Sequence, residues 1–326
     1  MATDDLPVGG HPGVLTSEDG SLLIKPALAA EVAFYQSVVA DAAFASLRPF
    51  LPKFYGTLRL QGKVDENAPP PAEGEPMQIQ PAASLVLENL SQPFLKPNIL
   101  DIKLGTVLYD DGASADKRAR MEKAARETTS LETGVRLTGF QVYDLATNEA
   151  VNTPKSYGKS IQPADLPDGI ARFFPLSPDA PPAHAEPAPE APPPITGTGL
   201  PAELLLPVLE SVREDVAEVR DALAAVEMRM VGGSLLVIYE ADWDRARAGI
   251  KWMEEVGEDD EDDDEDEDED EESVASKPGP PYIVKLIDFA HTKIVPGEGP
   301  DEGVLKGVDT VLGLLDGRIA QVKAAY

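Results

Sequence analysis

An acid and a base stand two positions apart in the otherwise apolar stretch of residues 96–105, whose sequence is KPNILDIKLG. The acid is Asp101 and the base is Lys103. Residues two apart on a β-strand point to the same face, so we expect these side chains to face one ligand together. Gly105 ends the stretch and lets the backbone turn or approach another group closely. The alternative for an Asp-x-Lys is an ion pair on the solvated face of an edge strand.

A second strand-like stretch, residues 283–287, also ends in a lone acid, Asp288. Phe289, Ala290 and His291 follow it directly. Two apolar strands that each deliver isolated polar groups favour a shared site over a surface ion pair.

These two stretches resemble the signatures of inositol polyphosphate kinases. Residues 97–105 match the pattern P-x-x-x-D-x-K-x-G, and residues 287–292 match the metal motif I-D-F-A-H-T. Between them, residues 233–236 resemble the S-S-L-L segment, with Gly233 in place of the first serine. The order and spacing agree over nearly the whole chain, and the fungal multikinases of the family are the most similar.

The resemblance implies an α+β, two-lobed kinase-like fold with antiparallel sheets, an inositol-binding helical segment and disordered inserts. It also implies a kinase that uses ATP and Mg²⁺ to phosphorylate inositol 1,4,5-trisphosphate to tetrakis- and pentakisphosphate. Two alternatives stay open. One is an inositol hexakisphosphate kinase that makes pyrophosphates, and the other is a non-catalytic acidic nuclear scaffold.

By resemblance, the catalytic and metal roles fall on four residues. Asp288 would bind Mg²⁺, which prefers carboxylate and phosphate oxygens, and through it ATP, while Ser234 supports the same metal. Lys103 would lie between the substrate and the transferred phosphate. Asp101 would orient a hydroxyl of either the substrate or the nucleotide.

Nucleotide binding is expected from the N-terminal part of the chain. Lys25 ends a predicted strand after a glycine-containing turn, where kinases hold nucleotide phosphates, although a solvated lysine is the alternative. A helix predicted over residues 27–45 offers Glu31 as its partner. The resemblance also places the Glu88 carbonyl and the Leu90 amide at the hinge, where they would bind adenine.

Substrate binding is expected from a basic helix over residues 114–129. Arg120, Lys123 and Arg126 recur every three residues and share one helical face. By position in the family, Lys123 and Arg126 would contact the inositol phosphate together with His291. The alternatives are a solvated basic helix and a structural histidine.

The chain divides into an N-lobe, residues 1–90, and a C-lobe, residues 91–326. Polar and proline-rich composition predicts disorder in the inserts 62–81, 175–199 and 257–281.

Apolar residues spaced by three and four from Leu205 to Met230 predict one long helix that ends at Gly232. Two strands follow, residues 234–240 and 282–287. We expect these two strands to pair antiparallel, with the acidic segment between them forming a long hairpin loop.

Composition narrows the class of protein. The 326 residues include no cysteine, which excludes disulfides and thiolate metal sites. Fifteen acids in one run, from Glu258 to Glu272, make up half of the net charge of −30. This balance does not favour direct nucleic-acid binding, although the run is suited to a basic protein partner. No secretory signal or membrane span is visible, so we expect a location in the nucleus, the cytoplasm or both.

Overall fold

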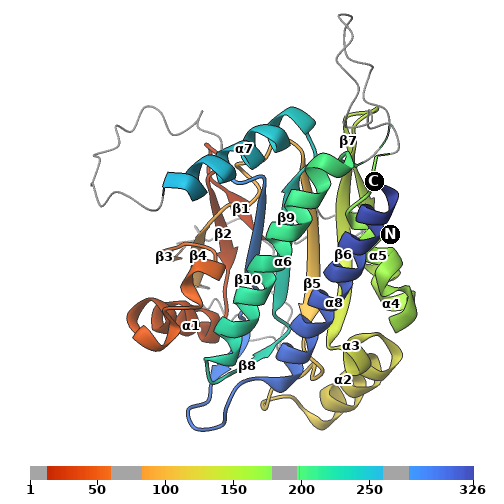
Figure 1. Cartoon of the computed structure of the whole chain (residues 1–326). Coiled ribbons are helices and arrows are strands. Elements are labelled where there is room, and N and C mark those ends of the chain that lie inside the picture. Colours follow the sequence, from red (N-terminus) through yellow and green to blue (C-terminus); the bar gives the residue numbers. More distant parts are fainter. Residues whose placement is uncertain (1–12, 60–82, 178–196, 198, 260–278) are drawn as a thin grey trace, which may run out of the picture.

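The computed structural model describes residues 13–59, 83–177, 197, 199–259 and 279–326. It has an α+β fold in which every strand pairing within a sheet is antiparallel (Figure 1). The smaller of two main sheets has the order β1-β2-β4-β3. Its strands are β1 (Leu15–Thr16), β2 (Leu22–Pro26), β3 (Phe54–Arg59) and β4 (Ala83–Glu88).

The larger sheet has the order β10-β9-β5-β6-β7. Strand β9, between β10 and β5, is buried at every position, because side chains on both of its faces are covered. A separate ribbon pairs β8 (Met228–Val231) with β11 (His291–Ile294). The strands of the larger sheet are β5 (Pro97–Leu104), β6 (Val135–Asp144), β7 (Glu149–Thr153), β9 (Ser234–Glu240) and β10 (Tyr282–Ile287).

Two long helices, α6 (Ala202–Ala224) and α8 (Glu302–Ala325), run side by side over one face of the larger sheet (Figure 1). The predicted helix is therefore present, but it ends at Ala224, and Met230 lies in strand β8 instead. Helix α8 was not predicted from the sequence. On the opposite face of the larger sheet, a small apolar cluster contains Leu90, Leu236 and Ile238.

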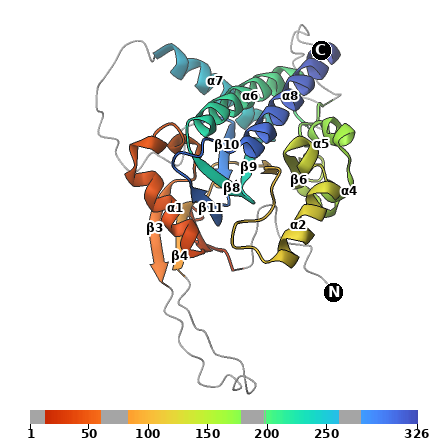
Figure 2. The same cartoon turned by 90° about the horizontal axis from the view of Figure 1, so that it is seen from below.

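Helices α1 and α2 lie near the lower end of the sheets, whereas α7 crosses their upper end (Figure 1). Seen from below, α1 and α2 stand on opposite sides of the β8–β11 ribbon (Figure 2). Ser114 caps α2 by accepting a hydrogen bond from the amide of Lys117. These elements are α1 (Ala29–Ala40), α2 (Ala115–Glu127), α3 (Ser130–Thr133), α4 (Lys155–Ser160), α5 (Leu166–Phe173), α7 (Trp243–Asp259) and the short 3₁₀ turns η1 (Ala42–Phe44), η2 (Arg48–Phe50) and η3 (Pro163–Asp165).

The expected antiparallel pair of β9 and β10 is confirmed, with Ser234 opposite Ile287. The connection between the two strands is not simply a loop, because it contains helix α7 up to Asp259. The helix expected over residues 27–45 is likewise shorter, since α1 ends at Ala40 and a 3₁₀ turn follows.

The expected disorder falls mostly outside the described residues. All of insert 62–81 lies there, as do most of inserts 175–199 and 257–281. The ends of the second insert are held together instead, because Leu176 forms a β-bridge with Leu200. The lobe boundary at residue 90 stays a prediction. None of the helices that the structure describes is long and apolar enough to cross a bilayer.

Candidate active site

Asp288 joins two lysines that come from different sheets. The Nζ atom of Lys25, at the end of β2, lies 3.0 Å from Asp288 Oδ1 and 3.0 Å from Glu31 Oε1 on α1. The Nζ atom of Lys103, on β5, lies 2.6 Å from Asp288 Oδ2. The lone acid and the Asp-x-Lys base of the sequence therefore meet at one point, together with the predicted nucleotide-binding lysine.

The backbone at Asp288 is strained in a way that aims its carboxylate. Its φ angle is 67°, in the left-handed region that residues other than glycine rarely adopt. The next residue, Phe289, is fully buried and stacks on Phe34 of α1 with ring centroids 4.2 Å apart. Packing of the aromatic ring thus holds the turn that presents Asp288 between the two lysines.

Strand register places two further polar groups near this point. Ser234 lies opposite Lys103 on one side and Ile287 on the other. Ser234 is fully buried and Asp101 is only 6% exposed, yet neither Ser234 Oγ nor Asp101 Oδ1 has a hydrogen-bond partner among the described residues. Buried polar atoms are almost always paired, so these two oxygens indicate a bound ligand.

The charge state of Lys25 follows from its surroundings. Burial lowers the pKa of Lys25, but attraction and hydrogen bonds from Asp288 and Glu31 outweigh this effect, and the net shift is upward. Lys25 therefore carries its positive charge throughout the neutral range and can bind an anion.

Residues 88–90, the predicted hinge, offer an apolar surface beside a backbone donor. Leu90 is buried against Leu236 and Ile238, and its amide makes no hydrogen bond within the described part of the chain. Glu88 is held in place, because its carboxylate accepts a hydrogen bond of 2.9 Å from the amide of Lys53. A flat heteroaromatic ring with an acceptor at its edge fits this arrangement.

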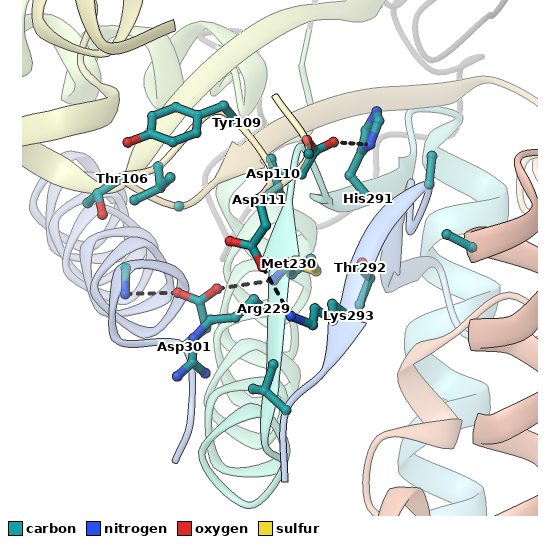
Figure 3. Close-up of a pocket in the computed structure, with 18 of the residues that line it drawn as sticks. Thr106, Tyr109, Asp110, Asp111, Arg229, Met230, His291, Thr292, Lys293 and Asp301 are labelled. Carbon is teal, nitrogen blue, oxygen red and sulfur yellow. Dashed lines mark hydrogen bonds and ion pairs between the residues drawn. The ribbon is translucent and has the colours of Figure 1, made fainter. Parts of the chain in front are cut away.

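A pocket of about 680 Å³, called the large pocket below, opens next to the ion pairs (Figure 3). Its wall includes Gly105, two residues beyond Lys103, and Ala290, two residues beyond Asp288. His291 also lines it, with Nδ1 2.7 Å from Asp110 Oδ2. The large pocket therefore borders both strand ends that deliver the lysine and the carboxylate.

Comparison with known proteins agrees with this geometry. Residues 84–189 and 198–316, more than half of the chain, match the family model for inositol polyphosphate kinase. The chain belongs to the inositol polyphosphate kinase family.

Named relatives lie on two branches of this family. The kinase is 32% identical over 359 residues to an inositol polyphosphate multikinase of Saccharomyces cerevisiae, covering 94% of this chain and 95% of that protein. It is 27% identical to inositol hexakisphosphate kinase 3 of Mus musculus, covering 71% of this chain and 50% of that protein.

A solved structure shows the same fold. The crystal structure of an inositol phosphate multikinase from Saccharomyces cerevisiae, in complex with ADP and Mn²⁺, matches with a TM-score of 0.63 and 27% identity. The match covers 92% of this chain and 100% of that chain.

The residues predicted to bind substrate from the basic helix lie apart from the ion pairs. Lys123 and Arg126 are exposed on α2 and do not line the large pocket. Lys123 pairs with Glu127 at 3.7 Å instead. Lys117 approaches the pocket more closely, with Nζ 3.8 Å from Asp110 Oδ2.

Several residues of the large pocket were not predicted from the sequence. Asp110 and Asp111 shortly follow the Gly105 turn, and Lys293 lies two positions beyond His291 on β11. All three residues lie within a few positions of a motif residue. A search of the sequence next to the motifs for charged residues would have identified them. Arg229 and Thr292 also line the pocket.

Gly233, which departs from the family pattern, has a structural explanation. A Cβ atom at this position would lie 2.5 Å from Cγ of Met230, closer than packing allows. The methionine side chain fills the space that a serine would need. The buried hydroxyl of this segment is therefore that of Ser234 alone.

The donor atoms fit a divalent metal held jointly with nucleotide phosphates. The described residues contain no group of three or more His, Cys, Asp or Glu side chains that could hold a metal. Mg²⁺ in kinases commonly takes one or two carboxylates and completes its shell with phosphates and water. Asp288, with the unpaired hydroxyl of Ser234, matches this requirement.

Proposed function

We propose that this kinase is an ATP-dependent inositol polyphosphate multikinase that converts inositol 1,4,5-trisphosphate to tetrakis- and pentakisphosphate. The observation that carries the proposal is the position of Asp288 between Lys25 and Lys103 at the edge of the large pocket. Phosphoryl transfer needs reactants held in line and charge neutralised, with little covalent chemistry from the protein.

Each side chain has a defined task in this proposal. Lys25 binds nucleotide phosphates, and Lys103 contacts both the transferred phosphate and the acceptor. When phosphates pair with the ammonium groups of Lys25 and Lys103, the Asp288 oxygens would be available to hold Mg²⁺. The Ser234 hydroxyl would support the same metal. The metal, when bound, neutralises charge on the phosphates.

Three further groups complete the binding sites. Asp101 accepts a hydrogen bond from a hydroxyl, and the Glu88 carbonyl and Leu90 amide bind adenine. The ring of the acceptor enters the large pocket beside His291, with Lys123 and Arg126 contacting its outer phosphates. These residue roles are part of the proposal.

The test is to incubate the protein with ATP, Mg²⁺ and either inositol trisphosphate or hexakisphosphate, and to separate products by phosphate number. We expect stepwise tetrakis- and pentakisphosphate, and a loss of about 10²–10³-fold in rate for Lys103→Ala, since that charge is directed at the transferred group. Absence of product from trisphosphate would contradict the proposal.

A second candidate function is favoured by the similarity to hexakisphosphate kinases. Products formed only from hexakisphosphate, in the same assay, would assign the chain to that branch.

We further propose that the run from Glu258 to Glu272 binds a basic protein partner and that the kinase acts in the nucleus, the cytoplasm or both. The support for the partner is the charge of the run alone. Deletion of the run should abolish salt-sensitive capture of a basic protein such as histone, whereas Asp288→Ala should not. Fractionation of cells that express the tagged chain tests its location.

A further inference from the structure

Within the described part of the chain, the basic side chains of the large pocket each lie close to a carboxylate on the same wall (Figure 3). A phosphate that enters must compete with these internal partners. The pairs are His291–Asp110 at 2.7 Å, Lys293–Asp111 at 3.1 Å and Arg229–Glu298 at 3.6 Å.

Asp110 is the best placed of these carboxylates to act on a ligand. Its side chain is 29% exposed, whereas that of Asp111 is 87% exposed. It is also held from two sides, by His291 at 2.7 Å and by Lys117 at 3.8 Å. A carboxylate that is partly buried and fixed in position is screened less by solvent than an exposed one.

A separate observation marks the large pocket as a place where a polar ligand binds. Thr292 lines the large pocket and is only 7% exposed. Its Oγ1 atom has no hydrogen-bond partner among the described residues. Because a buried hydroxyl is rarely left unpaired, a polar ligand in the large pocket is the partner that this hydroxyl lacks, on the face of β11 opposite to that of His291 and Lys293.

We propose that Asp110 determines specificity by accepting a hydrogen bond from a free hydroxyl of the inositol ring and rejecting a phosphate at that position. This inference rests on the proposed function and deepens it. An ionised carboxylate only accepts hydrogen bonds, so a ring hydroxyl can pair with it and a phosphate dianion cannot. Like charges brought together in an interface suppress the wrong partner.

The chemistry of the substrates makes the consequence definite. Inositol trisphosphate and tetrakisphosphate keep hydroxyls that can face Asp110. Hexakisphosphate carries a phosphate on every ring carbon and has no hydroxyl to offer. The charge of Asp110 therefore favours trisphosphate over hexakisphosphate as the substrate, because only trisphosphate can place a hydroxyl at this subsite.

The experiment compares Asp110→Asn with Asp116→Asn in the full chain. Asparagine keeps the size of the side chain and removes its charge. Asp116 is exposed on α2 and does not line the large pocket, so its variant makes the same change in net charge outside the pocket. For each protein, the KM for trisphosphate and the inhibition constant of hexakisphosphate against that reaction are measured on one preparation. The ratio of the two constants is unaffected by any misfolded fraction.

We expect Asp110→Asn to strengthen binding of hexakisphosphate about tenfold relative to that of trisphosphate, which is the effect of removing one like-charge contact. Asp116→Asn should leave the ratio of the two constants unchanged. An unchanged ratio in Asp110→Asn, or an equal change in both variants, would overturn the inference while leaving the kinase activity established. A wild-type protein that does not phosphorylate trisphosphate would refute the proposed function, and this inference with it.

Discussion

At the scale of single residues, Asp288 organises the site, because both lysines depend on its charge. Asn tolerates the left-handed backbone at this position, so Asp288→Asn removes the charge with little change in shape. We expect phosphorylation to fall by about 10²–10³-fold. Stability should fall by about 1–3 kcal/mol, since Lys25 and Lys103 lose their shared anion. Rate assays and urea unfolding measure the two effects, and full activity in this variant would contradict the assigned role.

Asp215, on α6, makes a residue-scale prediction about pH. It accepts a hydrogen bond of 3.2 Å from the hydroxyl of Tyr282, and burial raises its pKa to about 6 from 3.8. Between these values the folded protein binds more protons than the unfolded chain, so this group makes stability fall as pH rises from about 4 to 6.

The corresponding test is Asp215→Asn, which keeps an acceptor for Tyr282. The variant should be more stable than the wild type at pH 7, by about 1 kcal/mol after allowance for partial exposure. The advantage should vanish near pH 4. Urea unfolding at both pH values measures the difference in free energy of unfolding between the variant and the wild type. An equal difference at pH 4 and pH 7 would show that Asp215 has an ordinary pKa.

At the scale of elements, the packing of α6 and α8 illustrates which interactions matter most. Leu209 of α6 is fully buried in the core, so Leu209→Ala should reduce the free energy of unfolding by about 2–5 kcal/mol. Arg220 pairs with Asp309 of α8 at 2.6 Å but remains 38% exposed. Arg220→Ala should therefore cost much less than Leu209→Ala, and less still at high salt. A larger loss for Arg220 than for Leu209 would show that ion pairs, and not apolar contacts, hold the two helices together.

At the scale of the whole molecule, the active site is assembled from two sheets, so a ligand bound across them should stabilise the complete fold. A non-hydrolysable ATP analogue with Mg²⁺, at about 100 times its Kd, should add about 2.7 kcal/mol and raise the Tm. Chelation of Mg²⁺ should remove most of this shift, because Asp288 then loses its link to the phosphates. Scanning calorimetry measures the rise in Tm. Lys25→Ala, which lacks the predicted phosphate contact, is the matched variant. An equal shift with and without the chelator would exclude a metal-dependent nucleotide site.

The sequence by itself determined strands β5, β9 and β10, the motif positions and the family, because each depends on patterns that are local along the chain. Short apolar runs predicted β5, β9 and β10, and motif spacing singled out Asp101, Lys103 and Asp288. The same local reading failed at Met230, which continues the helical spacing of α6 but lies in β8. Its pairing partner there is Thr292, far along the chain, and no local pattern can contain that information.

Only the tertiary structure decided how these groups meet. Lys25 and Asp288 are 263 positions apart, yet they share a hydrogen bond of 3.0 Å. Asp110 and His291 are also distant in sequence and adjacent in the structure. The large pocket therefore contains carboxylates beside its basic side chains. Local sequence sets which face of a strand a side chain occupies. Which elements become neighbours depends on burial summed over the whole chain, and this is why the charge pattern of the site emerged only once the sheets and helices were packed.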